Sequence, residues 1–232
     1  PFRLEPIERG NSAVALPLQP KPDLAHVQRV GIPRALLYWR YDQLWRGFFE
    51  GIGRAVVVSP PTDKAIVERG EALSIDECCL ASKAYMGHVD ALQGECDAVF
   101  VPSYGNGGAH AGFCTKFQGL PDLVRSTFRD APTPIASLLV ENVMDKKGTE
   151  RAVVELGMRF GASAKQAKAA YAAGLKAQRA ADRQRAAAQA ERLAELARQR
   201  ASASRAQQPI GILVVAHPYI AHDGYLSGSI VE

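Results

Sequence analysis

The sequence predicts an α/β protein: a Rossmann-like, doubly wound parallel sheet, then a long helical segment and the start of a second α/β unit. The first observation is a series of short, nearly all-apolar runs, typical of strands covered on both faces. The second is that helical patterns alternate with these runs, as in doubly wound domains. The third is a stretch after residue 147, rich in alanine, arginine and glutamine, which are strong helix formers.

Five apolar runs are predicted as strands, and the last of them opens the second α/β unit. The side-chain spacing between Leu44 and Ile52 predicts an amphipathic helix. Thr62 or Asp63 is predicted to cap a short helix that ends near Arg69. Glycines are expected to interrupt the helical stretch at three positions, Gly157, Gly161 and Gly174. The predicted strands are 28–33, 55–59, 97–102, 134–140 and 210–215, and the further helices are 79–92, 122–128 and 175–205.

These elements divide the chain into four parts. Residues 1–26 carry five prolines without sustained periodicity and are predicted to be a linker or extended arm. Residues 27–146 form the cysteine-bearing α/β domain, 147–207 the alanine- and arginine-rich helical segment, and 208–232 the start of a second α/β unit. We expect that unit to continue in a longer protein, because the sequence stops just after a strand-and-turn signal.

The charge distribution bears on the class of partner. Net charge is +4, but residues 147–206 hold 13 Lys and Arg against 5 Asp and Glu, so the basic character belongs to the helical segment alone. That segment has no aromatic residue after Tyr171, which favours a solvated helix, or one packed on a neighbouring domain, over a nucleic-acid surface. No apolar run is long enough to span a bilayer, and no signal peptide is visible, so we expect a reducing, cytoplasmic location without membrane partners.

The four cysteines are the main candidates for chemistry, because clustered thiols in a reducing compartment indicate metal or redox sites. Cys78 and Cys79 begin a helix, where the dipole lowers a thiol pKa, although adjacent side chains point apart and only one is expected to be a ligand. Cys114 follows the next parallel strand, so its loop should reach the same sheet edge. From spacing alone, buried apolar cysteines are an equally good interpretation. Cys96 precedes a strand at the opposite edge and is interpreted as structural.

Other polar residues give weaker signals. His88, near the end of the Cys79 helix, is interpreted as a satisfied, partly buried histidine. His217 and Tyr219 follow the last predicted strand at the ligand-binding edge. The glycine-rich loop 104–112 lacks the G-K-[ST] ending of a phosphate-binding P-loop, which favours a role in placing Cys114.

Several motifs in combination resemble the domain of 2-hydroxyacyl-CoA dehydratase activase-related proteins, a CoA-substrate-specific enzyme activase family similar to dehydratase subunits and double-cubane-cluster proteins. The resemblance covers about residues 28–145 and 209–225. The motifs are Val30-Gly-Ile-Pro-Arg-Ala-Leu36, Phe48-Phe49, Val58-Ser-Pro-Pro61, Cys79-Leu-Ala-Ser-Lys83 with Gly87-His88, Cys114 through Gly119-Leu-Pro-Asp122, and His217-Pro-Tyr219 with Asp223.

The resemblance implies a [4Fe-4S] cluster in a low-potential electron-transfer system. Cys79 and Cys114 match family cysteines, Cys78 is an additional thiol, and the lysines Lys83 and Lys116 would compensate cluster charge. The implied partners are an actin-like ATPase activase, as a domain or separate protein, and an acyl-CoA dehydratase-type protein.

Two departures from the family pattern support a different function. Ala81 and Thr115 replace the prolines that follow the two family cysteines. They favour the alternative hypothesis, a cluster-free binding or scaffold domain of the same fold. A third hypothesis is an acyl-CoA lyase that binds its substrate at the sheet edge.

Overall fold

A four-stranded, fully parallel sheet forms the centre of the domain and confirms the predicted α/β fold. The computed structural model describes residues 22–105, 114–141, 146–204 and 206–228. The strand order is β2-β1-β3-β5, with β1 in register between its two neighbours. The strands are β1 (Arg29–Ile32), β2 (Ala55–Val58), β3 (Ala98–Phe100) and β5 (Ile135–Ala136).

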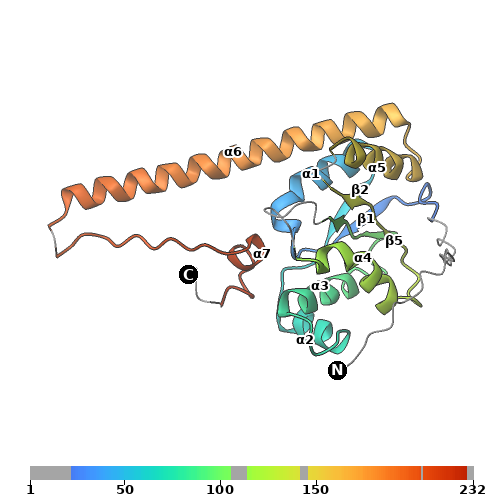
Figure 1. The fold of residues 1–232 in the computed structure, drawn as a ribbon, viewed down its shortest axis with the longest axis horizontal. Helices are drawn as coiled ribbons and strands as arrows, with labels where there is room; N and C mark the ends of the chain where they lie inside the picture. Colours follow the sequence, from blue (N-terminus) through green and yellow to red (C-terminus); the bar gives the residue numbers. More distant parts are fainter. Residues whose placement is uncertain (1–21, 106–113, 142–145, 205, 229–232) are drawn as a thin grey trace, which may run out of the picture.

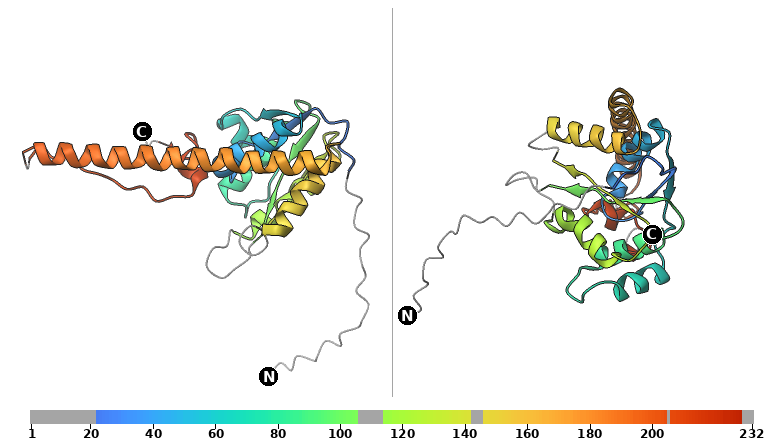
Figure 2. Two further views of the ribbon diagram at one scale, coloured as in Figure 1. Left: turned by 90° about the horizontal axis from the view of Figure 1, so that it is seen from above. Right: turned by 90° about the vertical axis from the view of Figure 1, so that its right-hand side faces the viewer.

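Helices cover both faces of this sheet (Figures 1 and 2). From β1 the chain moves outward to β2, whereas from β3 it moves in the opposite direction to β5. The switch point of the topology therefore lies between the carboxyl ends of β1 and β3, where open α/β sheets bind ligands. One face carries α1 (Tyr38–Gly51) with α5 (Lys146–Arg159) and α6 (Ala164–Ser202), and the other carries α2 (Lys64–Ala72), α3 (Leu80–Asp90) and α4 (Lys116–Thr127).

The predicted strand 134–140 is divided in the structure. After β5 the chain forms β6 (Leu139–Val140), which pairs in parallel with β4 (Ser103–Tyr104) as a separate two-stranded sheet. Prediction and structure also differ for α4, which begins at Lys116, six residues before the predicted 122. The predicted cap of α2 is confirmed, because the Asp63 carboxylate accepts a hydrogen bond from the Ile66 amide at 2.8 Å.

Aromatic side chains between α1 and the sheet make up much of the core. The ring centroids of Trp45 and Phe100 lie 4.8 Å apart, and the Phe49 ring lies 5.0 Å from Phe100 and 5.4 Å from Phe160. Leu24, in the part of the predicted arm that the structure describes, is fully buried in the same core. The packed domain therefore begins a few residues earlier than the sequence predicted.

Only one of the three predicted glycine breaks interrupts the helical segment. Gly161 has a φ of +84° and lies in the connection between α5 and α6, as expected. Gly157 and Gly174 lie inside helices, so these two predictions are wrong. A Cβ atom on Gly174 would lie 2.4 Å from the Leu44 carbonyl oxygen of α1, and one on Gly157 would lie 2.5 Å from the Ala167 Cβ. Both glycines allow helices to approach closely.

Beyond the domain, α6 continues as a long exposed helix, and the chain then returns alongside it to the short helix α7 (Pro218–Ala221) (Figures 1 and 2). Residues 210–215, predicted as a buried strand, have no sheet partner in the described part of the chain. Ile210 is 84% and Val215 is 88% exposed, so the prediction of burial is wrong for this structure. The second α/β unit as a whole stays a prediction. Among the described helices, none combines the length and apolar character needed to cross a bilayer.

Two glycine-to-alanine substitutions should have opposite effects on stability. Alanine favours helix at both positions by roughly 1 kcal/mol. At Gly174 the new Cβ would press on the α1 backbone, so Gly174→Ala should destabilise the domain by about 1–3 kcal/mol. At Gly119 in α4 nothing lies within 4 Å of the new atom, so Gly119→Ala should stabilise it. Denaturant unfolding of both variants measures the difference, and equal shifts would argue against the close α1–α6 packing.

Candidate functional site

Cys79 lies at the carboxyl edge of the sheet as the N-cap residue of α3, and its side chain is exposed. Its Sγ lies 3.2 Å from the Ser82 Oγ. Partial burial raises the pKa of the Cys79 thiol, but hydrogen bonds from the Ser82 side chain and backbone, with the charge of Lys116, outweigh it and leave the pKa below its ordinary value. The surroundings of Cys79 therefore favour its thiolate form more than those of an ordinary cysteine do.

Cys114 lies just before α4 and is also exposed. Its carbonyl oxygen accepts a hydrogen bond from the Phe117 amide at 2.9 Å, which places it at the entrance of that helix beside Lys116. Tyr219 lies near both cysteines. Burial raises the pKa of its phenol, and charges on the nearby Cys79 and Cys114 raise this pKa further. Both thiols therefore lie close to one phenol, although they come from different loops.

Residues 217–219 complete this cluster. The His217 and Tyr219 rings are stacked, with centroids 5.1 Å apart and planes within 7° of each other. The Tyr219 ring lies 6.4 Å from that of Phe117 in α4. The structure thus brings together five of the residues singled out from the sequence, namely Cys79, Cys114, Lys116, His217 and Tyr219.

The other predicted site residues are less directly involved. Cys78 is half-buried, and its amide donates to the Ile75 carbonyl oxygen. Lys83 lies one helical turn after Cys79, and its ammonium has no ion pair or hydrogen bond among the described residues. Cys96 is buried with its Sγ 3.3 Å from the Leu92 carbonyl oxygen, and burial raises the pKa of its thiol to about 11, as suits a structural cysteine. Within the described ranges, no three or more His, Cys, Asp or Glu side chains form a group that could hold a metal ion.

His88 is fully buried, and both of its ring nitrogens are hydrogen-bonded. Its Nδ1 lies 2.9 Å from the Ser59 Oγ, and its Nε2 lies 2.9 Å from the Thr62 Oγ1. The Thr62 hydroxyl donates to the Asp223 carboxylate, so its oxygen must accept from His88 Nε2–H. Nδ1 then accepts a hydrogen bond from the Ser59 hydroxyl group. The Ser59 oxygen in turn accepts a hydrogen bond from the Arg34 amide at 2.8 Å. Only a neutral histidine matches every donor to an acceptor along this chain, because a proton on Nδ1 would leave the Ser59 hydroxyl hydrogen without an acceptor among these groups.

This polar chain anchors the segment that carries Tyr219. Asp223 is only 2% exposed, and its Oδ1 accepts hydrogen bonds from the amides of Tyr225 and Leu226, each at 3.1 Å. Its second oxygen accepts from Thr62, which follows β2. Sequence reasoning missed Ser59 and Thr62, although both are hydroxyl residues just after a strand, where the ligand-binding edge begins.

Burial lowers the pKa of His88 to about 4, with Arg34 acting in the same direction and Asp223 and Asp63 opposing it. The neutral form required by the hydrogen bonds is therefore also the form that the surroundings favour.

These features define a parallel α/β domain that gathers two thiols, a lysine and a tyrosine at the carboxyl edge of its sheet. Residues 29–232 match the family model described as CoA enzyme activase uncharacterised domain (DUF2229), so the chain belongs to that family. The match confirms the activase-related resemblance found in the sequence. None of the curated proteins compared with the chain matches it.

We expect the buried His88 to make stability fall in acid. Its folded pKa of about 4 lies below the ordinary 6.5, so between these values the unfolded chain binds a proton that the folded chain does not. Stability should be complete above pH 6.5 and decrease toward pH 4, by about 3 kcal/mol. Urea unfolding of the parent and of His88→Gln across this range isolates the effect, since other acidic groups act on both. Parallel curves would contradict it.

Asp223→Ala should loosen the segment that carries Tyr219. The amides of Tyr225 and Leu226 lose their acceptor and Thr62 loses its partner, so we expect faster hydrogen exchange over 217–227, equivalent to about 1–3 kcal/mol. The matched control is Asp122→Ala, which removes an 84% exposed carboxylate that pairs with Arg125 among the described residues. Peptide-resolved exchange that is equal in both variants would show that Asp223 does not anchor the segment.

Proposed function

We propose that this chain is an iron–sulfur electron-transfer module of a 2-hydroxyacyl-CoA dehydratase activase-like system. Membership in the CoA enzyme activase family supports the choice of system. The observation that carries the proposal is the position of Cys79 and Cys114, which come from two different loops and both act on the Tyr219 phenol. They lie at the edge where open α/β sheets bind their ligands.

The chemistry of these residues suits a [4Fe-4S] cluster. Cysteine thiolates are the usual ligands of such clusters, and the lowered pKa of Cys79 favours the ligating form. The Lys116 charge, which acts on Cys79, would offset the negative charge of a thiolate-ligated cluster. When bound, the cluster supplies single-electron transfer at low potential.

The donor set is incomplete in the described part of the chain, where no group of three candidate ligands occurs. The proposal therefore assigns Cys79 and Cys114 as ligands and takes the remaining ones from outside the described residues or from a partner protein. Cys78 is the additional thiol nearest in sequence, and its half-buried side chain is available for a rearranged site.

The surrounding residues have separate roles in this proposal. Tyr219 and Phe117 place aromatic rings next to the two exposed thiols. Lys116, in the first turn of α4, helps to lower the pKa of the Cys79 thiol. Lys83, one turn along α3 from Cys79, adds positive charge on that helix.

We place the module between two partners. An actin-like ATPase activase, fused or separate, would drive electrons into it through ATP hydrolysis, and an acyl-CoA dehydratase-type protein would receive them. Free thiols at an exposed edge fit a reducing, cytoplasmic compartment.

Iron and acid-labile sulfide, measured on the longest protein that contains this chain and purified without oxygen, test the proposal. We expect about four of each per chain. Cys79→Ser and Cys114→Ser should each lose most of the iron and the broad visible absorbance. The matched control is Cys96→Ala, which removes a thiol that is buried away from the edge and should leave the iron content unchanged.

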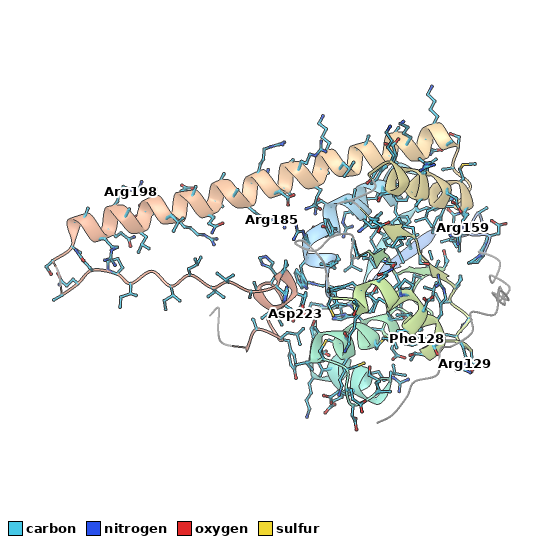
Figure 3. All side chains as sticks on the ribbon, in the orientation of Figure 1. Phe128, Arg129, Arg159, Arg185, Arg198 and Asp223 are labelled. Atoms are coloured by element: carbon cyan, nitrogen blue, oxygen red, sulfur yellow. The ribbon has the colours of Figure 1, made fainter. Side chains whose placement is uncertain are left out.

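The second candidate is a cluster-free binding or scaffold domain, and the long exposed part of α6 favours it. Arg198, labelled in Figure 3, lies on this part of the helix, where its guanidinium pairs only with Glu195 of the same helix among the described residues. Iron near zero after anaerobic reconstitution, or iron that persists in both cysteine variants, would overturn the cluster assignment and leave this candidate.

A further inference from the structure

Ser82 has a buried hydroxyl group whose hydrogen-bond partner is a sulfur atom. Its Oγ lies 3.2 Å from the Cys79 Sγ, and the residue is only 4% exposed. Serine hydroxyls inside helices commonly donate to a backbone carbonyl oxygen three or four residues earlier. The Ser82 hydroxyl forms no such bond among the described residues, so the sulfur is its partner.

The first turn of α3 fixes this contact. Cys79 is the N-cap residue of the helix and Ser82 is its third residue, so the two side chains lie three positions apart, on the same side of the helix. The Ser82 amide donates to the Cys79 carbonyl oxygen at 2.9 Å, which joins the two residues through the backbone as well. The distance between the hydroxyl and the sulfur is therefore set by the helix itself.

The direction of this hydrogen bond depends on the state of the sulfur. In a free thiol either atom can be the donor. A thiolate that binds iron has no proton, so only the Ser82 hydroxyl can donate to it. Burial raises the pKa of the Cys79 thiol, and the Ser82 side chain has the largest opposing effect, ahead of the Lys116 charge. Ser82 is thus the strongest of these groups in stabilising negative charge on the sulfur.

Cys114, the second proposed ligand, lacks an equivalent donor. Its side chain is exposed, and within the described ranges its Sγ takes part in no hydrogen bond. The hydroxyl donor therefore belongs to the α3 side of the site alone.

We propose that Ser82 is a positioning residue that donates a hydrogen bond to the Cys79 sulfur of the bound cluster and thereby raises the reduction potential of the cluster. The inference rests on the proposed iron–sulfur function. Reduction adds one electron, supplied by the activase partner, to a thiolate-ligated cluster that already carries negative charge. A donor directed at a ligating sulfur stabilises the reduced form more than the oxidised form. The cysteines hold the iron, so Ser82 is not required for cluster binding.

A redox titration followed by electron paramagnetic resonance tests the proposal, on the longest protein that contains this chain, purified without oxygen. Ser82→Ala should keep about four iron atoms per chain. At a fixed solution potential, its ratio of reduced to oxidised cluster should be lower by about tenfold, a shift of about 59 mV to more negative potential for one electron.

Two further variants assign the shift to the hydroxyl group. Ser82→Thr keeps a hydroxyl and should stay close to the parent potential. Ser126→Ala removes the hydroxyl of an exposed serine in the last turn of α4, and as the matched control it should leave the potential unchanged.

The outcomes separate this inference from the iron–sulfur proposal. Ser82→Ala with full iron content and the parent potential would overturn the role of Ser82 and leave the cluster assignment intact. A parent protein without iron after reconstitution would overturn both. If Ser82→Ala binds no iron, Ser82→Gly, which also lacks the hydroxyl, replaces it. Loss of iron from both variants would overturn the tuning role, because Ser82 would then be needed to hold the cluster.

Discussion

The hydrogen-bond chain from Ser59 through His88 and Thr62 to Asp223 holds the last described segment against the carboxyl edge of the sheet. Thr62 and Asp223 are 161 positions apart, so this contact is among the longest-range interactions in the domain. Because neutral histidine has one donor and one acceptor, each hydroxyl in the chain has a defined direction. The position of Tyr219 next to the two thiols depends on this anchor.

The parallel topology explains why so many polar groups converge there. Arg34 follows β1, Ser59 follows β2, and Cys114 lies in the connection after β3. Successive loops therefore place a guanidinium, a hydroxyl and a thiol group at one edge of the sheet. At the opposite edge, Cys96 precedes β3 and is buried with a raised pKa. The thiol pKa values of these two cysteines therefore shift in opposite directions for reasons of position, since Cys79 has Ser82 and Lys116 around it.

Local pattern predicted the fold and much of the candidate site. The apolar runs before Pro33, Ser59 and Pro102 became parallel strands, although the edge strand β2 is only half-buried, and their order placed the two cysteine loops at one edge. The run 210–215 has the same composition but is exposed, because burial depends on what covers a segment and composition does not report that. Gly174 was misread for a related reason: its role is set by the Leu44 backbone, 130 positions away in the sequence, and not by helix propensity. Ser59 and Thr62 were missed because a hydrogen-bond partner such as His88 is visible only once the fold is known.

The short helix α7 lies between the thiol edge and a hollow beside Trp39. Tyr219 of α7 lies against the thiols, while Pro218 and His222, at its two ends, line the hollow beside Trp39. His222 and Trp39 have ring centroids 6.3 Å apart, and Asp223 follows at once and fixes the turn. The same four-residue helix therefore lies next to both the exposed thiols and the hollow. Because no sheet pairing in the described part of the chain holds this four-residue helix, the position of Tyr219 beside the thiols depends on the hydrogen bonds that Asp223 accepts from Thr62 and from the amides that follow it.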